Sequence, residues 1–193
     1  MTAPPPTRTL YVIACAAGAA PEVGRLIDRA LEEHWDVHVI ATPAAANFLD
    51  LVDLAAQTGH LVLIEHHLGG DEPGGSLPRA DAIIVAPATF NTINKWARGI
   101  SDNYALGILA EAIGLGIPIV VLPFVNAALA AHPAFARSVA LLRDAGVMIV
   151  LRPGELERHP PGAVAERLAA FPWDLALDAA DALARVAAAT RVT

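Results

Sequence analysis

The chain has 193 residues, of which 55% are hydrophobic and 17% are charged. This composition is too apolar for a disordered protein, and the length favours one globular domain. Thirteen Lys and Arg against twenty Asp and Glu give a net charge of −7, which argues against a nucleic-acid partner. The mean hydropathy of +0.48 is high, but charges or turn residues interrupt every apolar run before the roughly 18 residues that a membrane span needs.

Cys15 is the only cysteine of the chain. It excludes an intrachain disulfide and a zinc site built from several thiolates, and it favours a reducing, cytoplasmic location. Residues 1–8 contain a Pro run but no apolar signal core, and they are predicted to be a disordered leader. Residues 9–193 are expected to form the single domain.

The first half of the chain alternates predicted strands and helices. Residues 10–14 and 37–41 are continuous apolar runs, typical of strands covered on both faces, and apolar residues at helical spacing after Pro21 predict a helix between them. This order indicates a parallel crossover unit. An Ala-rich helical segment is expected after Pro43. Residues 60–64 predict a third strand, which leads into a Gly-rich loop over residues 68–76.

The second half continues the alternation. Strands are predicted over residues 82–86, 118–122 and 147–151, and helices over residues 93–98, 104–113, 134–145 and 176–189. Gly146 is placed to stop the third of these helices. The pattern predicts a three-layer, Rossmann-like (flavodoxin-like) α/β fold with a doubly wound, mainly parallel sheet in a single domain.

Ligands of open parallel sheets bind beyond the carboxyl ends of the strands, so the residues there are the candidates for a site. Small residues, Cys15 to Gly18, follow the first strand and would let backbone N–H groups approach a phosphate, although a small-residue turn without a ligand explains them equally well. The pattern is not a dinucleotide fingerprint. Thr42 after the second strand offers a hydroxyl to the same crevice or caps the next helix.

Two polar segments follow later strands. Pro87-Ala88-Thr89-Phe90-Asn91-Thr92 comes after residues 82–86, with Ser101-Asp102-Asn103 further on, and Pro123-Phe124-Val125-Asn126 comes after residues 118–122, with His132-Pro133-Ala134 beyond it. Side chains of this kind cap helices or hydrogen-bond the edge of a heterocycle. The two segments resemble, over roughly residues 10–150, the homo-oligomeric flavin-containing cysteine decarboxylases, which include phosphopantothenoylcysteine decarboxylase and the lanthipeptide decarboxylases. That family carries the motifs Pro-Ala-Ser-Ala-Asn-Thr and Pro-x-Met-Asn.

The resemblance implies an FMN site between the subunits of a homotrimer, which in some members assembles into a dodecamer. The substrate it implies is a small thiol or a cysteine-terminated peptide, which is oxidised and loses its carboxylate. By position, Asn126 would face the substrate. The cofactor-binding residues would be Cys15, Ala16, Ala17 and Thr42 at the phosphate and ribityl chain, and Thr89, Phe90, Asn91, Thr92 and Phe124 around the isoalloxazine.

The chain departs from the family pattern in several places. The catalytic histidine of the family would stand near Pro73, and His67 is the candidate to replace it if the Gly-rich loop folds back; a solvent-facing histidine is the alternative. Phe90 is larger than the family's residue, Val125 replaces the motif methionine, and residues 152–172 contain no cysteine-bearing substrate flap. Cys15 is either a reactive thiol or a buried filler.

Other charged residues and other functions remain as alternatives. Lys95 and Arg98 are interpreted as a solvated helix face, and Asp102 as a cap or turn residue. A non-catalytic flavin-binding regulatory or scaffold subunit would retain the pocket without the chemistry. A flavin prenyltransferase-like enzyme is a further alternative, disfavoured because charged residues for dimethylallyl phosphate are not evident over residues 118–135.

Overall fold

Five parallel strands form the centre of the protein, in the order β2-β1-β3-β4-β5. The structure is a computed structural model, which describes residues 8–65, 77–151, 168 and 171–191. Because the strand order reverses direction between β1 and β3, the crevice that doubly wound sheets use for ligands opens there. The strands are β1 (Arg8–Ala14), β2 (Trp35–Ala41), β3 (Ala82–Ala88), β4 (Ile119–Pro123) and β5 (Met148–Ile149).

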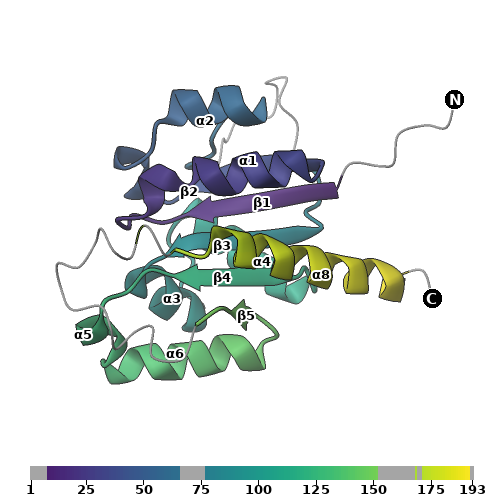
Figure 1. The fold of residues 1–193 in the computed structure, drawn as a ribbon. Helices are drawn as coiled ribbons and strands as arrows, with labels where there is room; N and C mark the ends of the chain where they lie inside the picture. Colours follow the sequence, from purple (N-terminus) through teal and green to yellow (C-terminus); the bar gives the residue numbers. More distant parts are fainter. Residues whose placement is uncertain (1–7, 66–76, 152–167, 169–170, 192–193) are drawn as a thin grey trace, which may run out of the picture.

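Helices cover both faces of this sheet, which confirms the predicted three-layer, doubly wound α/β fold (Figure 1). One face packs against α1 (Gly24–Glu32), α2 (Leu51–Thr58) and α8 (Trp173–Arg191). The other packs against α3 (Phe90–Ala97), α4 (Tyr104–Gly114) and α6 (Pro133–Asp144). Short helical turns complete the fold: η1 (Ala20–Glu22), η2 (Ala45–Asn47) and α5 (Ala127–Ala130).

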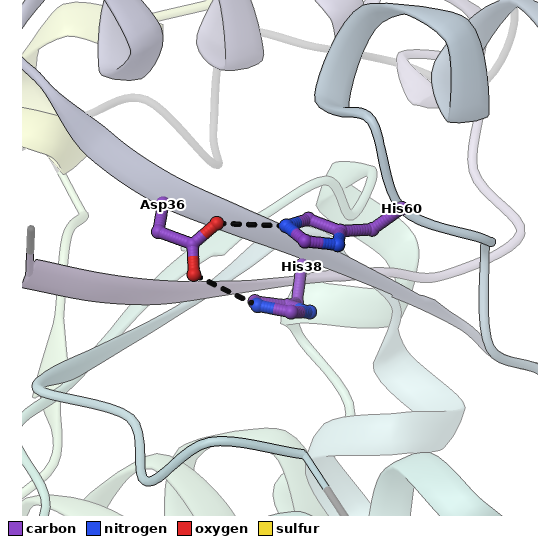
Figure 2. A group of neighbouring side chains, drawn as sticks. All are labelled: Asp36, His38 and His60. Atoms are coloured by element: carbon purple, nitrogen blue, oxygen red, sulfur yellow. Dashed lines mark hydrogen bonds and ion pairs between the residues drawn. The ribbon is translucent and has the colours of Figure 1, made fainter. Parts of the chain in front are cut away.

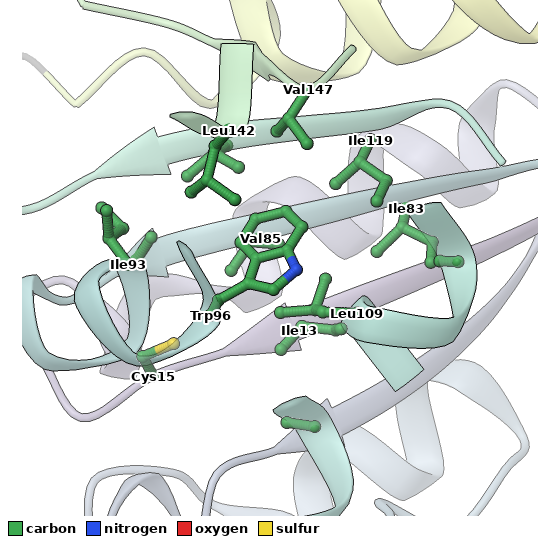
Figure 3. Close-up of a cluster of buried hydrophobic side chains, with 14 of the residues drawn as sticks. Ile13, Cys15, Ile83, Val85, Ile93, Trp96, Leu109, Ile119, Leu142 and Val147 are labelled. Atoms are coloured by element: carbon green, nitrogen blue, oxygen red, sulfur yellow. The ribbon is translucent and has the colours of Figure 1, made fainter. Parts of the chain in front are cut away.

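The continuous apolar runs of the sequence are strands buried on both sides. In β1, Val12 lies between Val39 of β2 and Ile84 of β3, and all three side chains are almost completely buried. On the opposite face, Trp96 of α3 and Leu109 of α4 pack with the sheet residues shown in Figure 3. Burial on both faces explains why these strands show no polar alternation.

Several element bounds differ from the sequence prediction. Residues 60–64 do not form a strand; they contribute one isolated parallel bridge, between Leu63 and Ile40, and Leu61 beside it is exposed. Pro21 lies in the 3-10 turn η1 rather than in the first turn of α1, which begins at Gly24. The last strand is two residues long instead of five, and α8 begins at Trp173, ahead of the predicted start.

Other predicted features agree with the structure. Gly146 follows α6 with a φ of +88°, a conformation in which glycine has no Cβ to clash, and it ends the helix as expected. Among the described helices, none has the length and apolarity required to cross a membrane. Residues 1–7 of the predicted leader, His67 and the Gly-rich loop lie outside the described residues. Arg8, the last residue of the predicted leader, is instead the first residue of β1, where it pairs with Trp35 of β2.

Candidate functional site

A cavity of about 720 Å³ opens at the carboxyl ends of β1 to β4. Its walls come from the four segments that follow these strands, together with the turn before α4. Of the eleven residues predicted for the site, nine line it: Ala16, Ala17, Thr42, Thr89, Phe90, Asn91, Thr92, Phe124 and Asn126. Segments as far apart in sequence as residues 16 and 126 therefore meet in one place.

The turn after β1 forms one wall through its backbone. Ala16, Ala17 and Gly18 line the cavity, and the short side chains leave their peptide groups close to it. The N–H of Ala17 bonds to Cys15 O at 2.8 Å. Within the described part of the chain, the N–H groups of Ala16 and Gly18 donate no hydrogen bond. These two groups are suitable donors for an anionic ligand.

Cys15 lies behind this turn and does not line the cavity. Its side chain is almost completely buried, and this burial raises the pKa of the thiol. Hydrogen bonds with the Thr92 side chain and the Thr89 backbone lower the pKa by less. Of the two interpretations from sequence, the buried filler therefore fits the structure, because a reactive thiol needs a lowered pKa and access.

Thr42 reaches the cavity from the end of β2. Its backbone N–H donates to Ala14 O at 3.0 Å, which fixes the two strand ends side by side. Its hydroxyl does not cap the next helix: η2 begins after Ala44 without a side-chain cap, and Asp50 caps α2. The helix-capping alternative for Thr42 is therefore wrong.

The segment after β3 enters α3 along the cavity wall. Thr89 is the N-cap of α3, where its hydroxyl oxygen accepts from Thr92 N at 3.2 Å and lies 3.0 Å from the Thr92 hydroxyl. Phe90 lies next to it, with its ring stacked on Phe135 at 6.2 Å and edge-on to His132 at 5.7 Å. This packing fixes an aromatic wall of the cavity.

The segment after β4 forms the neighbouring part of the wall. Phe124 N donates to Ala88 O at 2.8 Å, and the ring packs edge-on against Phe171. Asn126 caps α5, because its Oδ1 accepts from Leu129 N at 2.9 Å. This bond directs the side-chain oxygen to the helix, so the amide NH₂ of Asn126 remains available to donate a hydrogen bond to a ligand. Val125, at the motif methionine position, is buried in the core instead of lining the cavity.

An ion pair at the wall was missed in the sequence. Lys95 on α3 and Asp102 before α4 lie 2.5 Å apart, and both line the cavity. Sequence alone places Lys95 on a solvated face, and Asn103 rather than Asp102 caps α4. The pairing depends on the turn at Gly99, where φ is +69°. The positive-φ turn brings into contact two charges seven residues apart, whereas side chains that touch within one helix are three or four residues apart.

The charges at this site balance. Lys95 and Asp102 are the only ionisable residues among the described lining residues, and they neutralise each other. Neutral donors and acceptors from Thr and Asn, backbone N–H groups and two Phe rings make up much of the remaining wall. Such a surface suits a flat heterocycle that carries a polar chain.

The chain is similar to several known proteins. The protein-family model described as Flavoprotein matches residues 3–166. Over 152 residues, the chain is 29% identical to the coenzyme A biosynthesis bifunctional protein CoaBC of Bacillus subtilis, an alignment that covers 72% of this chain and 35% of that protein. The chain thus spans about a third of the length of the curated relatives that it matches most fully.

Solved structures show the same fold. The FMN-dependent cysteine decarboxylase SpaF superposes with a TM-score of 0.63 at 28% identity, over 75% of this chain and 83% of that chain. The cypemycin decarboxylase CypD superposes with a TM-score of 0.70 at 21% identity, over 94% and 96% of the two chains. With the family model covering most of its length, the chain belongs to the Flavoprotein family.

Proposed function

We propose that this chain binds FMN in the strand-end cavity and uses it in the oxidative decarboxylation of a cysteine-type thiol or of a peptide that ends in cysteine. The observation that carries the proposal is the convergence of the segments after β1, β2, β3 and β4 on one cavity. Membership of the Flavoprotein family and the structural likeness to SpaF, described as an FMN-dependent cysteine decarboxylase, support it.

The cavity fits the phosphate end of FMN. Its volume lies within the range of about 300–1,000 Å³ of small-ligand sites. Ala16 and Gly18 offer backbone N–H groups, and Thr42 lines the same cavity. Neutral N–H and O–H donors suit a phosphate in a wall whose charges balance.

The same cavity fits the ring end. Phe90 and Phe124 supply apolar surface, and both rings are held by other aromatic side chains. Asn91 and Thr92 supply polar groups at the start of α3, near the N–H groups of its first turn. A flavin ring, which carries both donors and acceptors at its pyrimidine edge, matches this mixture of walls.

The residues of the chain would position the substrate. When bound, FMN supplies the two-electron oxidation that a cysteine-type substrate needs before it releases carbon dioxide. Asn126 presents its amide NH₂ as a hydrogen-bond donor to the substrate carboxylate. Lys95, which Asp102 holds at the wall, offers its ammonium N–H groups as a second donor to the same carboxylate. A substrate carboxylate is thus oriented by one neutral and one charged donor.

The proposal includes a homo-oligomer, a trimer or an assembly of trimers, with the cavity at the contact between subunits. Leu129 lines the cavity and is 40% exposed, and Ile100 near Asp102 is 44% exposed. Apolar side chains exposed beside a site suit a neighbouring subunit. Light scattering of the full chain tests this part, since a monomer would refute it.

The decisive experiment is spectroscopic. The purified, desalted chain is expected to show the visible bands of oxidised flavin, and its released chromophore to have the mass of FMN. Mixed anaerobically with a cysteine-terminated peptide, the protein is expected to bleach and to release one carbon dioxide per peptide oxidised. A colourless protein that takes up no added FMN would refute the proposal.

A second function is favoured by one observation. Among the described residues that line the cavity there is no histidine to move protons. A non-catalytic flavin-binding subunit would have this composition. A yellow protein that binds FMN but releases no carbon dioxide from cysteine, small thiols or cysteine-terminated peptides would support this second function instead.

A further inference from the structure

Three side chains at the β2 edge of the sheet form a compact cluster. Asp36 lies beside the paired rings of His38 and His60, and each of its carboxylate oxygens faces one imidazole (Figure 2). Nε2 of His60 lies 2.7 Å from Oδ1, and Nε2 of His38 lies 3.2 Å from Oδ2. The two imidazole rings are stacked, with their centroids 4.0 Å apart and their planes at 18°. Three potential ligand groups therefore converge on one point.

The backbone fixes all three residues. Asp36 and His38 are two residues apart on β2, so their side chains share a face of the sheet. His60 follows Gly59, which ends α2 with a φ of +75°. The His60 N–H donates to Oγ1 of Thr58 at 3.2 Å, and Leu63 then pairs with β2 through its N–H and carbonyl. The third residue is thereby held against the strand that carries the other two.

The cluster is closed on one side and open on the other. His38 is buried and lies edge-on to Tyr11, with ring centroids 6.0 Å apart. The side chains of Asp36 and His60 are about a third exposed, at 34% and 38%. In the described part of the chain, Asp36 contacts these two histidines and pairs with no Lys or Arg. The geometry resembles a half-enclosed binding site with access from solvent.

We propose that Asp36, His38 and His60 bind a divalent transition-metal ion, for which Zn²⁺ is the best match. One ligand atom from each residue lies within 4.8 Å of the others. Ligands at about 2.0–2.2 Å from a tetrahedral Zn²⁺ lie roughly 3.5 Å apart, so small side-chain rotations complete the site. Two imidazoles and a carboxylate suit Zn²⁺, whereas Mg²⁺ and Ca²⁺ prefer oxygen ligands.

The metal site is separate from the flavin site and does not depend on the proposed function. Thr42 follows the last residue of β2 and is four residues beyond His38, which corresponds to about 13 Å along an extended chain. A bound metal ion would link His60, in the segment after α2, to the edge strand β2, next to the β-bridge between Leu63 and Ile40. It would therefore stabilise the folded chain in addition to the contacts that hold this edge.

The test uses the full chain without an affinity tag, as purified. Titration with ZnCl₂ by calorimetry, and metal analysis after dialysis, are expected to give one Zn²⁺ per chain and a higher Tm. The variants Asp36→Asn and His60→Gln each replace one ligand at a partly exposed position, so both should fold. Each is expected to weaken Zn²⁺ binding at least about 10-fold, because a ligand is lost.

His34→Asn is the matched control. His34 is exposed, two residues before Asp36, and has a φ of +63°, which Asn tolerates. This variant is expected to bind Zn²⁺ as the original chain does. CoCl₂ added to the original chain should give the visible ligand-field bands of a nitrogen- and oxygen-ligated ion, a readout that needs no variant. Absence of Zn²⁺ binding, or equal affinity in His60→Gln and the original chain, would overturn the proposal.

Discussion

Lys95 on α3 and Asp102 in the turn before α4 form an ion pair of 2.5 Å at the cavity wall. Both side chains are partly exposed, at 32% and 47%, so the pair contributes little to folding stability, about 0–1 kcal/mol. Its larger effect is on the charge of the cavity. Loss of the lysine would leave a carboxylate facing any anionic ligand.

Lys95→Gln is therefore expected to weaken FMN binding by about 3- to 10-fold at low salt, which is the size of one partly screened charge contact. The measurement is a titration of the apoprotein with FMN, followed by quenching of flavin fluorescence. Unfolding in urea should change by less than about 1 kcal/mol.

The charge argument has an internal control. The double variant Lys95→Gln/Asp102→Asn removes both charges and is expected to recover most of the lost FMN affinity. Asp102→Asn alone leaves the lysine and is expected to bind FMN at least as tightly as the original chain. If the double variant binds as weakly as Lys95→Gln, the lysine acts through a direct contact rather than through charge balance.

Asn126→Asp is expected to abolish turnover while FMN remains bound. Aspartate retains the oxygen that accepts from Leu129 N, so the cap of α5 survives. It replaces the amide NH₂ with a negative charge that repels a substrate carboxylate. The rate of carbon dioxide release from a cysteine-terminated peptide is expected to fall at least about 100-fold.

The visible spectrum of the same Asn126→Asp sample is the control for this experiment. An unchanged flavin content shows that the cavity is intact, and any rate loss then belongs to the substrate step. Turnover equal to that of the original chain would remove Asn126 from the mechanism.

The sequence predicted the strand core well, for a physical reason. Residues 10–14 and 82–86 are apolar throughout because each strand is covered on both faces, a pattern that does not depend on distant partners. Residues 60–64 are also mostly apolar, but among them only Leu63 pairs with β2. An apolar run in the sequence does not show how many residues of a segment at the sheet edge will hydrogen-bond to the neighbouring strand.

The site was predictable to the extent that it lies at strand ends. Thr89 and Asn126 follow apolar runs directly, so the topology of a parallel sheet brings them together. The pair of Lys95 with Asp102 and the cluster of Asp36 with His60 were not predicted. Each depends on a turn with a positive φ, at Gly99 or Gly59, whose direction the residue pattern does not specify.

Leu109 provides a test of the core beneath the site. It is completely buried among the side chains of Figure 3, so Leu109→Ala is expected to lower the free energy of unfolding by about 2–5 kcal/mol. Val186 on α8 is 65% exposed, so Val186→Ala should change the free energy of unfolding by about 0.5 kcal/mol or less. Urea unfolding of both variants checks this, and equal losses would contradict the packing described for α4.

Cys15 is expected to resist alkylation in the folded protein. Burial favours the neutral thiol and raises its pKa, so the nucleophilic thiolate is scarce at pH 8. In the unfolded chain the thiol is exposed to water, so burial no longer disfavours the thiolate. Iodoacetamide at pH 8 should therefore label the folded chain only as fast as it unfolds, and should label it promptly in guanidinium. Because the chain has a single cysteine, mass spectrometry reads the label without ambiguity. Prompt labelling of the folded chain would show that the turn after β1 opens and exposes a reactive thiol beside the cavity.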